Sequence, residues 1–168
     1  MNLDFHTLTS TRNLPKLDFT EKNGEDPLGI DHFFHYELEM YMQSNLSKVW
    51  VIETGRKIIA YFTVSMSAIE LQKLDKLNEK VRGTTPKRYP SMLLGRMGVD
   101  KKYRKKGIGK KVCNFCTGLS SFIGQRIACR YIILETTLDK IPFYEKSGFI
   151  KAEKLPRKNK VWMYRKLV

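Results

Sequence analysis

The sequence contains few of the residues that build metal sites and disulfide frameworks. It has three cysteines, Cys113, Cys116 and Cys129, and only three histidines, at positions 6, 32 and 35. An odd cysteine count does not form a secreted disulfide framework. Cys113 and Cys116 make a C-x2-C pair, but no second pair of ligands completes a zinc site. We therefore expect no metal and interpret Cys113 and Cys116 as small buried hydrophobes.

Long apolar runs are also missing. No stretch of 18 apolar residues could form a transmembrane helix, and the opening residues MNLDFHTLTS lack the basic-then-apolar layout of a signal peptide. We expect no membrane partner and a cytoplasmic location. A chain of 168 residues with 42% apolar content suits a single globular domain over residues 1–168.

Charge is abundant and unevenly distributed. The net charge is +14, yet residues 1–47 carry eight acidic against three basic side chains, so the remainder carries +19. This asymmetry indicates an anionic partner, with a nucleic acid as one candidate. A solvated charged face is the other explanation, and composition alone does not separate the two.

Hydrophobic periodicity and turn residues predict alternating strands and helices, of the α+β class. An acidic loop at 20–29 precedes a helix for which Asp31 is the expected N-cap. Strands are predicted at 5–8, 48–53, 57–66, 92–99, 129–134, 149–153 and 160–168, and helices at 32–42, 69–83, from 108 onward, and 140–146.

The stretch from Tyr89 to Val112 combines an apolar strand, a basic turn and a helix. Gly107 and Gly109 lie where the helix begins. Helix N-termini present unpartnered N–H groups at the positive end of the helix dipole, and glycines let an anion approach them closely. The pattern therefore indicates phosphate binding. It is neither a Walker A loop nor the GxGxxG dinucleotide motif.

The run Arg104-Lys105-Lys106-Gly107-Ile108-Gly109 resembles the acetyl-CoA motif of the GNAT N-acetyltransferase superfamily. The resemblance implies a GNAT fold, with a mixed central sheet of about six to seven strands, flanked by helices and splayed in the middle. It also implies acetyl-CoA as co-substrate, with the pantetheine arm lying in the splay. The implied cofactor-binding residues are Met97, Gly98 and Val99 along the arm, and Arg104, Lys105, Lys106, Gly107, Ile108, Gly109 and Lys110 around the pyrophosphate.

A second run, Phe143-Tyr144-Glu145-Lys146-Ser147-Gly148-Phe149, is similar to the F-Y-x-x-x-G-F motif of the same superfamily. The resemblance implies that Tyr144 is the catalytic acid that protonates the departing thiolate. A phenol, with an ordinary pKa of about 10, is protonated at neutral pH and can donate. Packing of the Tyr144 ring between sheet and helix is the alternative. Glu53, Glu70 and Glu135 are candidate bases, and the sequence singles out none of them.

The run Leu94-Gly95-Arg96-Met97-Gly98-Val99-Asp100 resembles toxin-type GNAT enzymes that acetylate the amino group of aminoacyl-tRNA. This implies direct attack by a primary amine in a ternary complex, with tRNA as the anionic partner. Protein amines and polyamines stay open as acceptors, and so does a homodimer. The alternative from another class is a catalytically silent, basic RNA-binding module on a GNAT-like fold.

Overall fold

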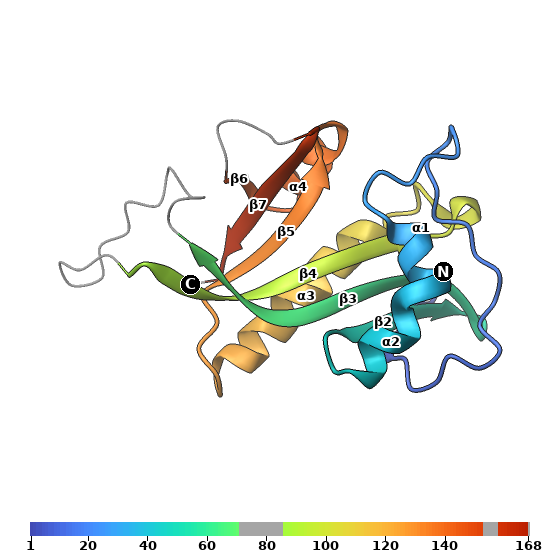
Figure 1. Cartoon of the computed structure of the whole chain (residues 1–168), viewed down its shortest axis with the longest axis horizontal. Helices are drawn as coiled ribbons and strands as arrows, with labels where there is room; N and C mark the ends of the chain where they lie inside the picture. The colour runs from blue at the N-terminus through green and yellow to red at the C-terminus, as the bar shows by residue number, and fades with distance from the viewer. Residues whose placement is uncertain (71–85, 153–157, 168) are drawn as a thin grey trace. The chain divides into compact units, whose positions relative to one another are not determined.

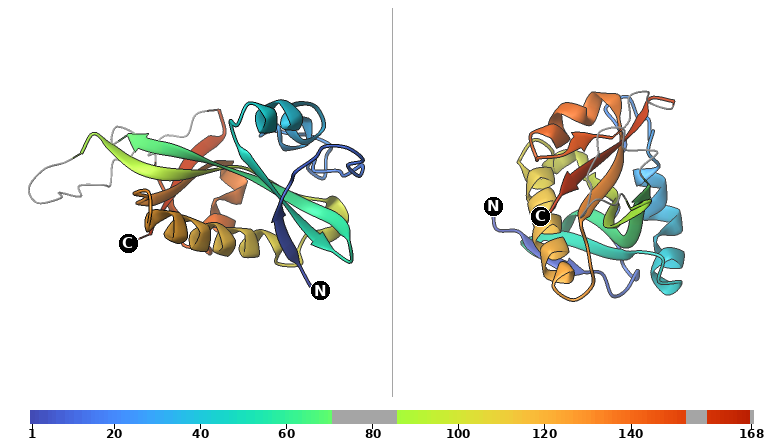
Figure 2. Two further views of the ribbon diagram at one scale, coloured as in Figure 1. Left: turned by 90° about the horizontal axis from the view of Figure 1, so that it is seen from below. Right: turned by 90° about the vertical axis from the view of Figure 1, so that its left-hand side faces the viewer.

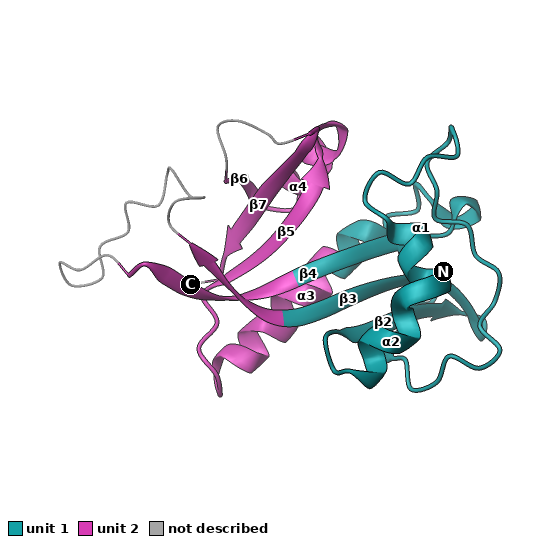
Figure 3. Ribbon diagram, viewed as in Figure 1, with its two compact units in different colours: residues 1–65, 94–112 teal, residues 66–93, 113–168 magenta. Residues whose placement is uncertain are grey.

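The computed structural model describes residues 1–70, 86–152 and 158–167, and the chain divides into two compact units (Figure 3). Unit 1 comprises Met1–Ser65 and Leu94–Val112, and unit 2 comprises Met66–Leu93 and Cys113–Val168. The boundary falls inside three elements: β3 (Lys57–Glu70), β4 (Arg88–Val99) and α3 (Ile108–Gly124). The single domain over residues 1–168 stays a prediction.

The strands form a seven-stranded mixed sheet with the order β1-β2-β3-β4-β5-β7-β6 (Figure 1). In unit 1, β1 (Asp4–Thr7) pairs antiparallel with β2 (Lys48–Thr54), and β2 pairs antiparallel with β3. Gly55 and Arg56 join β2 to β3 with φ values of 54° and 63°. Two consecutive positive φ values are the backbone of a tight two-residue turn. The strands predicted at 48–53 and 57–66 are present and form a hairpin.

The predicted helix over 32–42 is present but irregular. It consists of α1 (Ile30–His32), a π-helical turn η1 (Phe33–Glu37) and α2 (Leu38–Gln43). Asp31 as N-cap is wrong, because Gly29 occupies the cap position and the Asp26 carboxylate accepts the Ile30 and His32 amides. Asp31 instead accepts the amide of Phe19 at 2.8 Å.

The helical segment covers one face of the β2–β3 hairpin in unit 1 (Figure 2). Its apolar side chains pack against those of the strands, forming one buried cluster: Phe19, Phe33, Phe34, Leu38, Val49, Val51 and Tyr61. Aromatic edges meet faces within this cluster, with the Phe19 ring centroid 5.0 Å from both the Phe34 and the Tyr61 centroids. This packing fixes the helical segment on the hairpin.

Unit 2 is built on β5 (Tyr131–Thr137), which pairs in parallel with β4 and antiparallel with β7 (Lys160–Lys166). The short β6 (Ile150–Lys151) completes this edge by pairing with β7. α3 packs on β4, since the Ser120 hydroxyl donates to the Met92 sulfur at 3.3 Å. The remaining helical elements are η3 (Lys101–Tyr103) in unit 1, and η4 (Leu138–Lys140) and α4 (Ile141–Glu145) in unit 2.

Some predicted boundaries are wrong. The predicted helix at 69–83 begins in what is a strand, because β3 extends through Glu70, and its residues 71–83 lie outside the described part of the chain. The strand predicted at 129–134 begins two residues later and ends three residues later, because Cys129 and Arg130 precede β5 and the strand continues to Thr137. Residues 153 and 168, predicted as strand ends, also lie outside the described residues.

All three cysteines are free and buried, which confirms the interpretation of Cys113 and Cys116 as buried hydrophobes. His32 and His35 are partly exposed. Across residues 1–70, 86–152 and 158–167, no helix is long and apolar enough to cross a membrane.

Gly98 generates a stability prediction. A Cβ at this position would lie 2.7 Å from Phe19 Cδ1 and 2.8 Å from Ile30 Cγ2. We expect Gly98→Ala to lower the free energy of unfolding by about 1–3 kcal/mol, because both neighbours belong to a packed core. The matched control is Gly118→Ala in α3, where nothing lies within 4 Å of the new Cβ, and an increase of about 0.5–1 kcal/mol is expected. Denaturant unfolding measures both, and equal effects of the two substitutions would contradict the close contact.

Candidate active site

The turn after β4 is anchored by one buried carboxylate. Asp100 is 5% exposed and accepts the amides of Asp18 at 2.9 Å and Lys102 at 3.0 Å. The Lys101 amide donates to the Asp18 carbonyl, and the Lys101 ammonium lies 2.9 Å from the Asp18 carboxylate. Segments distant in the sequence are thereby joined at the end of the strand.

The backbone then turns sharply before α3 begins. Lys105 and Gly107 have φ values of 61° and 77°, and a Cβ at Gly107 would meet nothing within 4 Å. The first helical hydrogen bond runs from the Lys111 amide to the Gly107 carbonyl. Residues 108–110 therefore lie in the first turn of α3, where backbone amides have no carbonyl acceptor within the helix. Ile108 is 2% exposed and anchors the helix start.

Cationic side chains surround this turn. Lys105, Lys106 and Lys110 are exposed, and the Arg104 Nε donates to the Val99 carbonyl at 3.1 Å. Open space at a glycine with positive φ, free first-turn amides and exposed cations together fit a pyrophosphate. The seven residues predicted for this role, 104–110, therefore form one continuous structural element in unit 1.

Gly98 differs from its neighbours on β4. Its missing side chain faces Phe19 and Ile30, which cover that side of the strand. Met97 and Val99 point to the opposite side because side chains alternate along a strand, and both are only partly buried. Any role of Gly98 toward a ligand therefore involves its backbone.

The parallel pairing of β4 with β5 is short. It consists of Ser91 with Tyr131, Met92 with Ile132 and Leu93 with Ile133, although β4 continues to Val99 and β5 to Thr137. Beyond this point β5 carries two buried hydroxyls, Thr136 Oγ1 and Thr137 Oγ1, that have no hydrogen-bond partner within the described part of the chain. Buried polar groups are normally satisfied, so this pair is a candidate ligand contact. Sequence reasoning missed both threonines.

Tyr144 lies on α4 in unit 2 and is 8% exposed. Its ring meets those of Phe143 and Phe149, with centroids 4.9 and 5.8 Å away. Gly148 has a φ of 82°, which turns the chain so that the Phe149 amide donates to the Tyr144 carbonyl. This explains locally why a glycine lies between the two aromatic residues of the motif.

Burial raises the pKa of Tyr144 above the ordinary tyrosine value, and the neighbouring Cys113 and Cys116 thiols raise it further. Burial likewise raises the pKa of Cys113 to about 11. The phenol and both thiols are therefore neutral at physiological pH. Tyr144 has the protonation state that a proton donor requires.

The three candidate bases occupy different environments. Glu53 lies 3.2 Å from His6, and Glu70 lies 2.9 Å from Arg88. Glu135 is paired across strands with Trp162. None of these contacts distinguishes one of them as a base.

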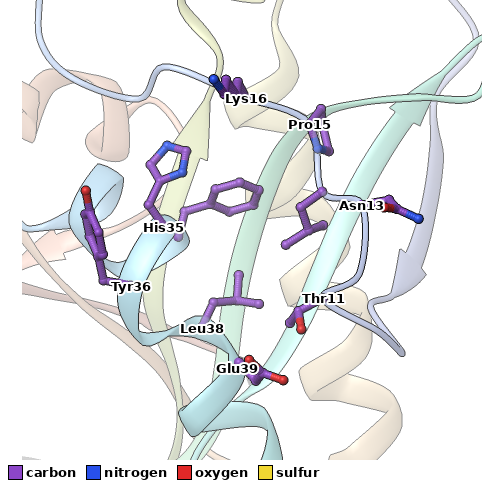
Figure 4. A pocket seen from close by; sticks show the side chains of 10 residues that line it. Thr11, Asn13, Pro15, Lys16, His35, Tyr36, Leu38 and Glu39 are labelled. Carbon is purple, nitrogen blue, oxygen red and sulfur yellow. The ribbon is translucent and has the colours of Figure 1, made fainter.

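A cavity of about 420 Å³ in unit 1 is lined by none of the predicted site residues, and Figure 4 shows the side chains that do line it. Segment 11–16 of the N-terminal region lines one side and residues 34–39 of the helical segment line the other. His35 projects between them and hydrogen-bonds the Leu17 carbonyl at 2.9 Å. The cavity contains no part of the phosphate-binding turn.

Comparison with known proteins agrees with this geometry. Residues 45–151 match the family model described as an acetyltransferase (GNAT) domain. No curated protein matches the chain.

Solved structures of bacterial toxins share the fold. A crystal structure of a bacterial toxin superposes with a TM-score of 0.83 at 19% identity, covering 99% of this chain and 91% of that one. A tyrosine-to-phenylalanine mutant of KacT superposes with a TM-score of 0.79 at 16% identity, covering 99% of this chain and 96% of that one. AtaT complexed with acetyl-methionyl-tRNAfMet superposes with a TM-score of 0.75 at 18% identity, covering 96% of this chain and 94% of that one. At these identities the likeness establishes the fold.

The ion pair between Asp18 and Lys101 leads to a prediction about how stability depends on pH. Hydrogen bonds from Lys101 and Thr20 lower the Asp18 pKa to about 2. A carboxylate with a depressed folded-state pKa stabilises the protein above its unfolded value, about 4, and that contribution is lost as pH falls towards about 2. We expect Asp18→Asn to lower the unfolding midpoint at pH 7, with the difference from wild type vanishing near pH 2. A pH-independent difference in thermal unfolding would contradict this.

Proposed function

Because the chain belongs to the GNAT acetyltransferase family, we propose that it transfers an acetyl group to a primary amine by direct attack in a ternary complex. Family membership makes it an N-acetyltransferase with acetyl-CoA as donor. The proposed part is the route and the acceptor: the amine attacks without an acyl-enzyme, and it is the amino group of an aminoacyl-tRNA.

The turn at 104–110 binds the donor through its pyrophosphate. First-turn amides of α3 donate to the phosphate oxygens, and the exposed lysines neutralise their charge. The backbone of residues 97–99 pairs with the amide-rich arm of the donor. In unit 2, Thr136 and Thr137 each carry a buried hydroxyl without a hydrogen-bond partner in the described protein, and since successive strand residues face opposite sides of the sheet, any one ligand meets only one of them.

Tyr144 protonates the thiolate that leaves when the acetyl group is transferred. The proton moves from the phenol oxygen to the sulfur, the amine nitrogen releases one proton to solvent as the amide bond forms, and a proton from solvent then restores the phenol. The observation that carries this role is the place of Tyr144 on α4, where its ring is 8% exposed and packs against Phe143 and Phe149 within the aromatic motif. Burial raises the pKa of Tyr144, so the phenol keeps its proton at neutral pH. An ionised phenol could not serve.

Charge and fold support an aminoacyl-tRNA acceptor over a polyamine. A chain with a net charge of +14 repels polycations and attracts RNA phosphates. The likeness to AtaT, solved in complex with acetyl-methionyl-tRNAfMet, is consistent with the same class of acceptor.

Substitution of Tyr144 tests the proton donor. We expect Tyr144→Phe to lower kcat by about 10²- to 10⁴-fold because the acid is removed while the ring is kept. The KM for acetyl-CoA should change little. Tyr103→Phe in η3 is the matched control and should keep kcat within about twofold of wild type. Steady-state kinetics measure both, and full turnover by Tyr144→Phe would exclude the acid role.

The acceptor is tested by supplying isotope-labelled acetyl-CoA with charged tRNA, uncharged tRNA, protein and polyamine together. We expect the label on the α-amino group of the esterified amino acid, identified by mass spectrometry after mild alkaline release. Binding of charged tRNA should weaken by about 10³-fold between 50 and 200 mM salt if some six phosphates are contacted. Label on lysine side chains or polyamines would contradict the proposed acceptor.

A further inference from the structure

An exposed aromatic pair stands on the helical segment of unit 1. Tyr36 is 78% exposed, and its ring lies 5.0 Å from that of His32 with an interplanar angle of 34°. The His32 side chain is 60% exposed. Tyr36 belongs to the π-helical turn η1, a local distortion that is frequent at functional sites.

This pair is connected by contacts to the central strand. His32 Nε2 lies 3.5 Å from Glu37 Oε1, and Glu37 Oε2 lies 3.9 Å from a terminal nitrogen of Arg96 on β4. The Arg96 guanidinium stacks over the Phe33 ring at 4.1 Å. The same strand leads directly into the phosphate-binding turn after Val99.

Arg96 has hydrogen-bonding capacity left over. Its Nε is buried and finds no acceptor among the residues that the structure describes, while the side chain as a whole is 27% exposed. The buried Nε is out of a ligand's reach, so a contact with an oxygen of phosphate or ester comes from the N–H groups on the two terminal nitrogens of the guanidinium.

The acidic residues nearby already have partners. Asp26 accepts two backbone amides, and Asp31 accepts the Phe19 amide and lies 3.7 Å from His35. Glu37 is shared between His32 and Arg96. These contacts reduce the repulsion that free carboxylates would exert on a phosphate.

We propose that Tyr36 and His32 form a stacking platform for one unpaired nucleobase of the RNA acceptor, with Arg96 donating to an oxygen of the same nucleotide. The proposal rests on the proposed function for the presence of RNA. Aromatic faces that bind single-stranded bases, together with arginine donors, are the usual means of holding unstacked nucleotides. A protein partner stacking on the same pair is the competing outcome.

The test measures binding without requiring catalysis. The probe is a fluorescent RNA hairpin with a four-nucleotide single-stranded 3′ extension, studied at 50 mM salt, alongside four versions that each lack one base of the extension. We expect Tyr36→Ala to raise the Kd for the intact hairpin by about 5- to 100-fold. For one abasic version, the Kd of wild type and variant should agree within about twofold, because the base that stacks is already missing. Tyr36→Phe should bind like wild type.

Phe122→Ala is the matched control, since Phe122 is a 55% exposed aromatic residue in unit 2. It should leave all five Kd values unchanged. Arg96→Gln should weaken binding of every hairpin alike and reduce the salt slope by about one.

Several results would overturn the platform. They are no binding of the hairpin at 50 mM salt, an unchanged Kd for Tyr36→Ala, or equal losses on the intact hairpin and all abasic versions. An unchanged Kd would assign the aromatic pair to a protein contact. Base-dependent binding without acetylation of charged tRNA would refute the proposed function and leave the platform standing. Acetylation of charged tRNA without base-dependent binding would refute the platform and leave the proposed function standing.

Discussion

The buried carboxylate of Asp100 is the constraint on which the candidate site depends. A carboxylate at 5% exposure is tolerated only when hydrogen bonds compensate its lost hydration. Here the amides of Asp18 and Lys102 supply them. One side chain thereby fixes where β4 ends, how the basic turn starts and which N-terminal segment lies beside it. These hydrogen bonds fix the backbone of the turn in the conformation that the proposed anion site requires.

Binding the donor's pyrophosphate and donating a proton, the two proposed tasks, fall to residues in an exposed and a buried environment respectively. Unit 1 contains the residues for the first task and unit 2 contains the residue for the second. Gripping a pyrophosphate requires exposed cations and unpartnered amides, which unit 1 presents at 104–110. The proposed proton donor has to stay neutral, which an ordinary phenol already does at pH 7, and in unit 2 burial raises the pKa of Tyr144 further. An exposed lysine and a buried tyrosine thus serve the same proposed reaction for different electrostatic reasons.

Contacts with distant residues give Arg96 and Glu37 an importance that their sequence positions do not indicate. Arg96 lies in an apolar run where a charged residue reads as a surface position, and Glu37 lies in an amphipathic helix. The π-helical turn and the Phe33 ring bring their charged groups within 3.9 Å of each other. The threonines at the end of β5 were equally hidden, because an unsatisfied hydroxyl is a property of three-dimensional packing.

The sequence by itself determined the local devices: the hairpin at Gly55 and Arg56, the strand–turn–helix around Gly107, and the aromatic motif closed by Gly148. Each depends on residues that are adjacent in the chain, so the backbone freedom of glycine and the spacing of apolar residues predict it from the sequence. Only the tertiary structure decided that β3 continues through Glu70, that Asp26 rather than Asp31 accepts the first helical amides, and that Tyr144 is buried beside two thiols. Those outcomes depend on long-range packing and desolvation, which no local pattern encodes.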